Sequence, residues 1–305
     1  MERKVSENFG FNTEGNLMVK EITVISGKGG TGKTSLTACF AVLSQNAVLT
    51  DCDVDAPDLH MLLKPEVIET QEFKASRVAV IDQDKCVQCG KCAEYCRFGA
   101  ITEQVIDHIL CEGCGVCAYI CPVAAIELEK RVSGYAFISK TKYGPMSHAL
   151  LNPGEENSGK LVALVRQNAK KIAEKEKCEL IINDGPPGIG CPVIASLGGV
   201  NIALIVVEPT LSGIHDMERA LGLLKHFKIP ALVCINKSDI NEVNKSRIVD
   251  FCKSKELAVV GKIPFDTIIT ESMVAGKPIV EYAPKSEISK AIGDMWKQII
   301  KIMII

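Results

Sequence analysis

The chain has few aromatic residues, no strong net charge and no long apolar run. Aromatic residues make up 5% of its 305 residues, which leaves little material for stacking nucleic-acid bases. The formal net charge is −2, so we expect no broad basic surface and no nucleic-acid partner. No apolar run approaches the roughly 18 residues that cross a bilayer, and no charged-then-apolar leader opens the chain. These absences favour a cytoplasmic protein without stable membrane insertion.

Cysteine, by contrast, is abundant. The chain has 14 cysteines, and in an α/β sequence of cytosolic character they indicate metal binding rather than disulfides. Eight of them form two runs with the same C-x2-C-x2-C-x3-C spacing: Cys86, Cys89, Cys92 and Cys96, then Cys111, Cys114, Cys117 and Cys121. The runs are shifted by 25 residues, and Ala100-Ile101 recurs as Ala125-Ile126. We interpret the segment as an internal duplication built around two metal sites.

This spacing is that of bacterial ferredoxins with two [4Fe–4S] clusters, in which the fourth cysteine of each run ligates the other cluster. The pattern predicts one cluster on Cys86, Cys89, Cys92 and Cys121, and the other on Cys111, Cys114, Cys117 and Cys96. Zinc is the competing interpretation, because four thiolates suit it too. Zinc sites pair two C-x2-C arms, however, and need no triple run. A purely structural role for the clusters stays open, although two clusters at close range favour electron transfer.

Residues 26–34, SGKGGTGKT, match the phosphate-binding loop G-x-x-x-x-G-K-[ST]. An apolar strand-like run precedes the match and a helical pattern follows it. Glycines allow the backbone N–H groups of such a loop to point at phosphate oxygens. Lys33 would then lie along the β- and γ-phosphates, and Thr34 would offer its hydroxyl to Mg²⁺. We expect the nucleotide to contact Gly27, Lys28, Gly29, Gly30, Thr31, Gly32, Lys33, Thr34 and Ser35.

Two apolar runs end in carboxylates that should lie near this loop. The run 47–51 ends at Asp51 and leads into an acidic turn that includes Asp53, and the run 180–184 ends at Asp184. In an open parallel sheet, ligands bind at the carboxyl ends of the strands. The second run has the Walker-B pattern, in which Asp184 holds Mg²⁺ through water. For Asp55 and Asp58, later in the acidic turn, a solvated surface is the alternative.

Lys28 adds a second lysine to the loop, and KGGTGKT resembles the deviant loop of the MinD/ParA/nitrogenase-iron-protein superfamily of ATPases. The resemblance implies that Lys28 reaches across a dimer interface to the partner's ATP, and hence a nucleotide-sandwich dimer. It also implies that Asp53 positions the attacking water. Lys28, Lys33, Asp53 and Asp184 are therefore the expected catalytic residues. Gly188 has the spacing from Asp184 that is typical of the family's second switch.

The same resemblance suggests a base-binding region and a further thiol. Asn236 would contact adenine, and Pro264 begins a loop that lies near the base in relatives, although a plain surface loop is equally consistent. Asp239 resembles the guanine-reading residue of GTPases, which keeps GTP as an alternative. Cys191 lies seven residues after Asp184, where the nitrogenase iron protein has an intersubunit cluster ligand. A buried small residue is the alternative for Cys191, because a second such cysteine has no match.

Buried strands that alternate with helical patterns predict an α/β fold with a doubly wound, mostly parallel sheet. We expect a flexible tail over 1–17, an ATPase domain over 18–81 and 131–305, and an inserted two-cluster ferredoxin domain over 82–130. Residues 60–80 are uninformative apart from a strand at 77–81. The segment from Ser286 has apolar residues at helical spacing, and packing on the sheet is favoured over membrane contact.

These features predict an ATPase with ATP, Mg²⁺ and two [4Fe–4S] clusters as cofactors. The leading hypothesis is ATP-gated electron delivery to a redox partner by a homodimer, or by a heterodimer with a related subunit. An iron–sulfur assembly carrier that serves an apo-protein is the first alternative. A positioning or regulatory switch like ParA and MinD is the second.

Overall fold

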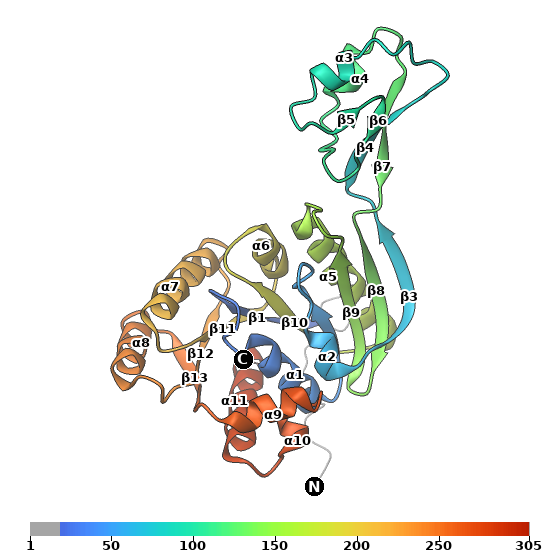
Figure 1. The fold of residues 1–305 in the computed structure, drawn as a ribbon. Helices are drawn as coiled ribbons and strands as arrows, with labels where there is room; N and C mark the ends of the chain where they lie inside the picture. Colours follow the sequence, from blue (N-terminus) through green and yellow to red (C-terminus); the bar gives the residue numbers. More distant parts are fainter. Residues whose placement is uncertain (1–18, 305) are drawn as a thin grey trace. The chain divides into compact units, whose positions relative to one another are not determined.

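The computed structural model describes residues 19–304 (Figure 1), so the predicted tail over 1–17 lies outside the described residues. The chain divides into two compact units. The larger unit comprises residues 19–70, 136–150 and 159–304, and the smaller one residues 71–135 and 151–158. The smaller unit includes the segment 82–130 that carries the eight regularly spaced cysteines.

The larger unit is built on a nine-stranded sheet with the order β13-β12-β11-β1-β10-β2-β9-β8-β3. Every neighbouring pair from β13 to β9 is parallel. The predicted mostly parallel, doubly wound sheet is therefore confirmed. Its strands are β1 (Lys20–Ser26), β2 (Ala47–Asp51), β3 (Glu66–Phe73), β8 (Gly134–Thr141), β9 (Gly144–Leu151), β10 (Leu180–Pro187), β11 (Ile202–Val207), β12 (Ala231–Asn236) and β13 (Ala258–Ile263).

Helices cover both faces of this sheet (Figure 1), because successive residues of a buried strand point to opposite sides. In β11, Leu204 joins the core that holds α1 and α11, whereas Ile205 joins the core that holds α7 and α8. The helices of this unit are α1 (Lys33–Ser44), α2 (Leu59–Leu63), α5 (Ser158–Glu176), α6 (Cys191–Leu197), α7 (Leu211–His226), α8 (Glu242–Ser254), α9 (Thr267–Val274), α10 (Ile279–Tyr282) and α11 (Glu287–Ile304).

The C-terminal helix α11 buries its apolar stripe against the sheet. Ile288, Ile292 and Ile299 belong to the core that includes α1, and Trp296 stacks on Phe40 with ring centroids 4.8 Å apart. Among residues 19–304, no helix is both long enough and apolar enough to cross a bilayer.

Two strands of the sheet left little trace in the sequence. β3 lies in the uninformative stretch 60–80, and seven of its eight residues are exposed. An exposed strand lacks the alternation of buried apolar side chains by which strands are recognised. β9 lies beside β2 and was not anticipated either.

The smaller unit holds two short antiparallel pairs and two short helices. β4 (Ser76–Ile81) pairs with β7 (Ile126–Arg131), and β5 (Ile101–Thr102) pairs with β6 (Val105–Ile106). The helices are α3 (Lys91–Glu94) and α4 (Val116–Ile120). A small core that includes Val78, Ala100 and Ile126 lies among the cysteines.

A histidine in β9 predicts how the stability of the larger unit depends on pH. His148 has its Nε2 atom 2.8 Å from the Ser139 hydroxyl oxygen and stacks on Phe137. Burial, with a smaller contribution from His60, lowers the pKa of His148 from 6.5 to about 4. Between these pH values the unfolded chain binds more protons than the folded chain. The free energy of unfolding should therefore fall as the pH drops below 6.5, by up to about 1.4 kcal/mol per pH unit.

The measurement is chemical denaturation of the wild type and His148→Gln at pH 7.5 and at pH 5. The glutamine variant can keep a hydrogen bond to Ser139 but cannot take up a proton, so its loss of stability on acidification should be smaller. Equal losses in the two proteins would contradict the assignment.

Candidate functional site

The phosphate loop lies between the central strand β1 and helix α1. β1 ends at Ser26 and α1 begins at Lys33, so the loop leaves the carboxyl end of the strand, where ligands bind in such sheets. Gly30 and Gly32 have φ angles of 77° and 87°, a region that side chains disfavour. The backbone of this turn therefore favours glycine at positions 30 and 32.

Asn236, the last residue of β12, is hydrogen-bonded to the backbone of the loop. Its side-chain amide donates to the carbonyl oxygen of Thr31 at 2.7 Å, and a Cβ atom at Gly32 would lie 2.4 Å from its Nδ2 atom. Asn236 thus has a contact that the sequence did not predict, and its expected contact with the base stays a prediction. The hydroxyl oxygen of Thr31 is buried and has no hydrogen-bond partner in the described part of the chain.

The other predicted loop residues border the same turn. A Cβ atom at Gly27 would lie 2.1 Å from the Cβ atom of Asp216, so the backbone there packs closely on α7. Gly29 is exposed, with open space where a side chain would point. Ser35, in the first turn of α1, has its hydroxyl oxygen 3.5 Å from the sulfur of Met273 in α9.

Lys33 and Asp184 form a buried ion pair under the loop. The Lys33 Nζ atom lies 3.0 Å from Asp184 Oδ1, and Thr37 donates to the same oxygen at 3.1 Å. Asp184 Oδ2 is buried and accepts no hydrogen bond from the described residues. The Thr34 hydroxyl oxygen lies 3.4 Å from Lys33 Nζ. A buried carboxylate oxygen without a donor is costly, and with Thr34 close to the pair this donor set fits Mg²⁺.

Asp51 and Asp53 add two carboxyl groups beside this pair. Asp51 lies opposite Asp184 in the register of β2 and β10, and it accepts the N–H groups of Asp53 at 3.0 Å and Leu59 at 3.1 Å. Burial and the nearby Asp184 raise the pKa of Asp51 well above its ordinary value. Burial also raises the pKa of Asp53, while the positive charge of Lys33 acts to lower it. Carboxylates crowded around one lysine suit a site that receives a further cation.

The same carboxylates determine the pKa of Lys33. Burial alone would lower its pKa, but the carboxylates of Asp184 and Asp51 outweigh burial and raise the pKa above 10.5. Lys33 is therefore fully charged at neutral pH, as a group that binds phosphate must be.

Lys28 is held within its own chain. Its Nζ atom lies 3.4 Å from Glu208 Oε2 and 3.5 Å from the Ser212 hydroxyl oxygen, and its side chain is 36% exposed. Glu208 also pairs with Lys237 at 2.5 Å. Glu208 was not predicted as a site residue, although it directly follows the apolar strand β11. The predicted reach of Lys28 to a partner's nucleotide concerns a second chain and stays a prediction.

The remaining expected site residues lie at loops around the sheet edge. Pro264 follows β13, and the next residue, Phe265, donates its N–H to Asp239 Oδ1 at 2.7 Å. Asp239 therefore fixes the loop that was predicted to lie near the base. Cys191 begins α6 and is exposed, so it is not the buried thiol that was the alternative.

In the smaller unit, the eight regularly spaced cysteines line two separate hollows, four cysteines to each. Within residues 19–304, no three His, Cys, Asp or Glu side chains converge on a single metal position, and the thiols of each set instead surround a hollow. One hollow is lined by Cys86, Cys89, Cys92 and Cys121, and the other by Cys96, Cys111, Cys114 and Cys117. These are the two sets that the crossed ligation pattern predicts.

The two halves of this unit repeat one another in detail. The N–H of Asp82 donates to Ala125 at 2.8 Å, and the N–H of Asp107 donates to Ala100 at 2.8 Å. Each aspartate also accepts the N–H of the cysteine four residues later, Cys86 or Cys111, at 3.0 Å. Each half therefore anchors its cysteine loop on the other half, which brings the fourth cysteine of one run to the other run's hollow.

Comparisons with known proteins cover most of the chain. Residues 22–279 match the family model described as the CobQ/CobB/MinD/ParA nucleotide binding domain. An uncharacterized protein of Methanocaldococcus jannaschii is 36% identical over 285 residues, which span 92% of this chain and 97% of that protein. The iron-sulfur cluster carrier protein of Aquifex aeolicus is 26% identical over 137 residues, 41% of this chain and 38% of that protein.

Among solved structures, the septum site-determining protein MinD from Pyrococcus horikoshii, complexed with Mg-ADP, matches with a TM-score of 0.61. The sequence identity is 19%, and the match covers 93% of this chain and 97% of MinD, so this likeness concerns the fold. With the phosphate loop, the parallel sheet and the family match in agreement, the chain belongs to the CobQ/CobB/MinD/ParA family of P-loop nucleotide-binding proteins.

Proposed function

We propose that this protein is a Mg²⁺-dependent ATPase that couples nucleotide turnover to electron transfer through two [4Fe–4S] clusters. The observation that carries the proposal is the sorting of eight cysteines into two hollows of four, within a chain that also has a complete phosphate loop. A [4Fe–4S] cluster bound by four thiolates accepts and releases an electron.

For the nucleotide, the proposal assigns phosphate binding to the loop amides and Lys33. Lys33 would exchange its contact with Asp184 for the phosphates. Asp184 and Thr34 would then hold Mg²⁺, and the unpartnered Oδ2 atom of Asp184 supports this role. Asp53, which is partly exposed beside them, would orient the attacking water. The Mg-ADP in the similar MinD structure is consistent with this assignment.

For the clusters, the proposal rests on how the two sets share one small unit. Cys96 follows the first run yet lines the second hollow, and Cys121 does the reverse. The sites are therefore neighbours, and electron transfer between neighbouring centres is fast because its rate falls steeply with distance. A redox partner protein would receive the electrons.

The proposed assembly is a nucleotide-sandwich dimer, either of two copies or with a related subunit. Lys28 would leave Glu208, to which it is weakly tied at 3.4 Å, and reach the partner's nucleotide. ATP can change the clusters only if it prefers one conformation of the protein, so the coupling requires a closed state that ATP stabilises.

Iron analysis of cysteine variants tests the crossed cluster assignment. Anaerobically reconstituted wild type should hold about eight iron atoms per chain, four in each cluster. Cys121→Ser and Cys96→Ser should each lose about half of this iron, and they should lose different clusters. The electron paramagnetic resonance spectra of the two reduced variants should therefore differ and should together account for the wild-type spectrum.

The matched control is Cys178→Ala, a buried cysteine of the larger unit, which should keep the full iron content. Wild type that binds zinc in place of iron under these conditions would contradict the cluster assignment. Midpoint potentials measured without nucleotide, with Mg-ADP and with Mg-ATP test the coupling, with Lys33→Ala as the control. If the midpoint potentials of the clusters are the same without nucleotide, with Mg-ADP and with Mg-ATP, the nucleotide site and the clusters are independent and the coupled function is refuted.

A second candidate function is an iron–sulfur assembly carrier. The exposed Cys191 and the partial likeness to an iron-sulfur cluster carrier protein favour it. A carrier should pass a labile cluster intact to an apo-protein, and Cys191→Ser should abolish this transfer. Electron delivery instead predicts clusters that survive dilution and a Cys191→Ser variant that retains them. A positioning switch predicts ATP-dependent association with membrane or DNA that persists in the Cys96→Ser and Cys121→Ser variants.

A further inference from the structure

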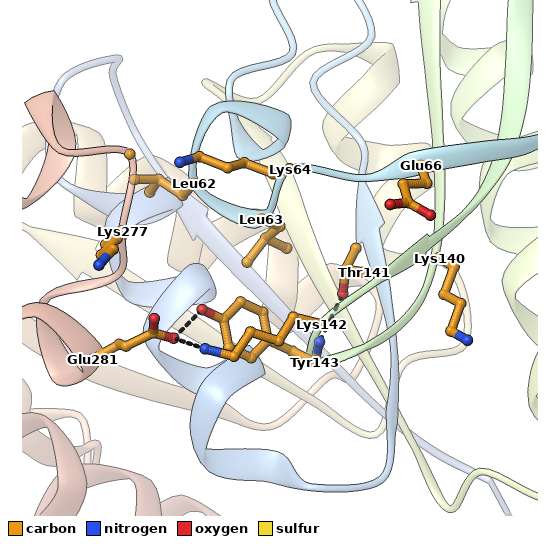
Figure 2. Close-up of a pocket in the computed structure, with 11 residues that line it drawn as sticks. Leu62, Leu63, Lys64, Glu66, Lys140, Thr141, Lys142, Tyr143, Lys277 and Glu281 are labelled. Atoms are coloured by element: carbon orange, nitrogen blue, oxygen red, sulfur yellow. Dashed lines mark hydrogen bonds and ion pairs between the residues drawn. The ribbon is translucent and has the colours of Figure 1, made fainter.

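A cavity of about 440 Å³ lies in the larger unit, and none of the phosphate-loop residues 26–35 lines it. Its size is within the range of small-molecule sites, about 300–1,000 Å³. Three separate segments form it, namely residues 62–66 from the end of α2 to the start of β3, residues 140–143 at the turn between β8 and β9, and residues 276–281 from the end of α9 into α10 (Figure 2).

The lining of this cavity is strongly basic. The charged residues are four lysines and two glutamates: Lys64, Lys140, Lys142, Lys277, Glu66 and Glu281. Lys142 pairs with Glu281 at 3.0 Å, whereas the other three lysines form no ion pair with any carboxylate of the described residues. The whole chain has a net charge of −2, so this concentration of positive charge is local. It creates a potential that favours an anion.

One of the two carboxylates of the lining, that of Glu281, already has hydrogen-bond partners. Tyr143 and Lys142 both donate to Glu281 Oε2 (Figure 2). The hydrogen bond from Tyr143, followed by that from Lys142, holds the pKa of Glu281 below its ordinary value. Glu281 is therefore ionised, and its hydrogen bonds go to Tyr143 and Lys142; the nearby Lys277 adds only a Coulombic contribution.

Lys64 and Lys277 both line this cavity. A Cβ atom at Gly276 would lie 3.1 Å from Lys64 Nζ, so the ammonium group of Lys64 reaches the residue that precedes Lys277. Leu62, Leu63 and the ring of Tyr143 border the same cavity (Figure 2). A ligand with two or more negative oxygens and a small carbon body would meet both cations and this apolar wall.

We propose that the cavity is a regulatory site for a small, multiply charged oxyanion, such as a phosphate ester or a polycarboxylate. Two helices beside the cavity, α2 and α9, also contact residues of the predicted nucleotide site. α2 starts at Leu59, whose N–H donates to Asp51, and α9 carries Met273, which contacts Ser35 of α1. An oxyanion that joins Lys64 to Lys277 ties these two segments together, and through them it changes nucleotide affinity. The change is reciprocal, because nucleotide then alters oxyanion affinity by the same factor.

The binding test is calorimetry on the full chain saturated with ADP, which occupies the phosphate loop. Inorganic phosphate and citrate are titrated separately, and chloride at matched ionic strength is the reference. We expect saturable binding of phosphate or citrate beyond that of chloride, and the better of the two identifies the ligand class. Lys64→Gln combined with Lys277→Gln should weaken this binding at least about tenfold, because two charge-assisted hydrogen bonds are lost.

The matched control combines Lys225→Gln with Lys228→Gln, two exposed lysines of the same unit outside the lining, and it should bind like the wild type. Circular dichroism checks that each variant is folded. Binding no stronger than that of chloride, or equal binding in the Lys64/Lys277 variant, would overturn the proposal. Oxyanion binding that leaves the affinity for ADP unchanged would overturn its regulatory part. Because neither readout uses the clusters or ATP turnover, both are independent of the proposed electron transfer.

Discussion

Replacing Lys33 with alanine is expected to reduce ATP hydrolysis by about 10²–10³-fold, the usual effect of removing one donor that stabilises transition-state charge. The variant loses the proposed contact with the β- and γ-phosphates. It also leaves the buried carboxylate of Asp184 without the ion pair at 3.0 Å. Steady-state turnover of Mg-ATP measures the effect, and Lys297→Ala, an exposed lysine paired with Asp294, should turn over ATP at the wild-type rate.

A second variant separates catalysis from folding at this position. Lys33→Arg keeps the positive charge beside Asp184 but changes the shape of the donor group, and the two cations are not interchangeable at a shaped site. It should therefore unfold like the wild type while hydrolysing ATP slowly. Turnover within tenfold of the wild type in both Lys33 variants would refute the assignment of the phosphate loop.

Replacing Arg166 with alanine should lower the free energy of unfolding by about 3–5 kcal/mol, as expected when one partner of a buried ion pair is removed. Arg166, in α5, lies 2.8 Å from each carboxylate oxygen of Glu21 in β1 and donates to the carbonyl oxygen of Ala195 at 2.9 Å. Both charged side chains are almost fully buried. Without Arg166, Glu21 would keep a buried charge whose main remaining partner is the Asn183 amide.

Urea denaturation under anaerobic conditions measures this loss in the free energy of unfolding. Lys170→Ala is the control, because Lys170 lies 3.7 Å from the same carboxylate but its side chain is 52% exposed, and such pairs contribute at most about 1 kcal/mol. The double variant Glu21→Leu with Arg166→Met should recover much of the lost stability, since it removes both charges together. A loss below about 1 kcal/mol in Arg166→Ala would show that the pair contributes little.

This ion pair matters for the site because it connects the strands that carry Asp184 and Asp51. Asn183 connects Glu21 to Thr50, whose hydroxyl donates to the Asn183 side chain at 2.6 Å. Asn183 and Thr50 immediately precede Asp184 and Asp51 in β10 and β2. A slip of one residue in either strand would turn its carboxylate to the opposite face of the sheet. The buried network therefore helps hold Asp184 and Asp51 on the side of Lys33.

Those parts of the protein whose geometry depends on a few consecutive residues were predictable from the sequence. The glycines at 30 and 32 have the positive φ angles that the loop motif requires. The predicted strand 47–51 is observed with the same bounds, because a fully buried parallel strand appears as a continuous apolar run. The cysteine spacing likewise predicted which four thiols line each hollow.

Contacts between segments far apart in the chain could not be predicted from the sequence. The partner of Lys28 is Glu208, and the partner of Thr31 is Asn236. Neither pairing has a local signature in the chain. Arg166 and Glu21 were not predicted from the sequence, because a single charged residue in a helix or strand does not reveal whether its side chain is buried. The strand β3 was not predicted because it is mostly exposed and lacks the alternation of buried apolar side chains that marks a strand.

By itself, the amino-acid sequence determined the phosphate loop, the two cysteine sets and the alternation of strands and helices, because each depends on short-range backbone geometry or on the spacing of one residue type. The tertiary structure alone decided the buried Glu21–Arg166 pair, the support of the loop by Asn236 and the lysine-lined cavity. Each of these joins residues far apart in the chain. Their energies arise from burial and charge proximity, which exist only after the sheet and its helices have packed.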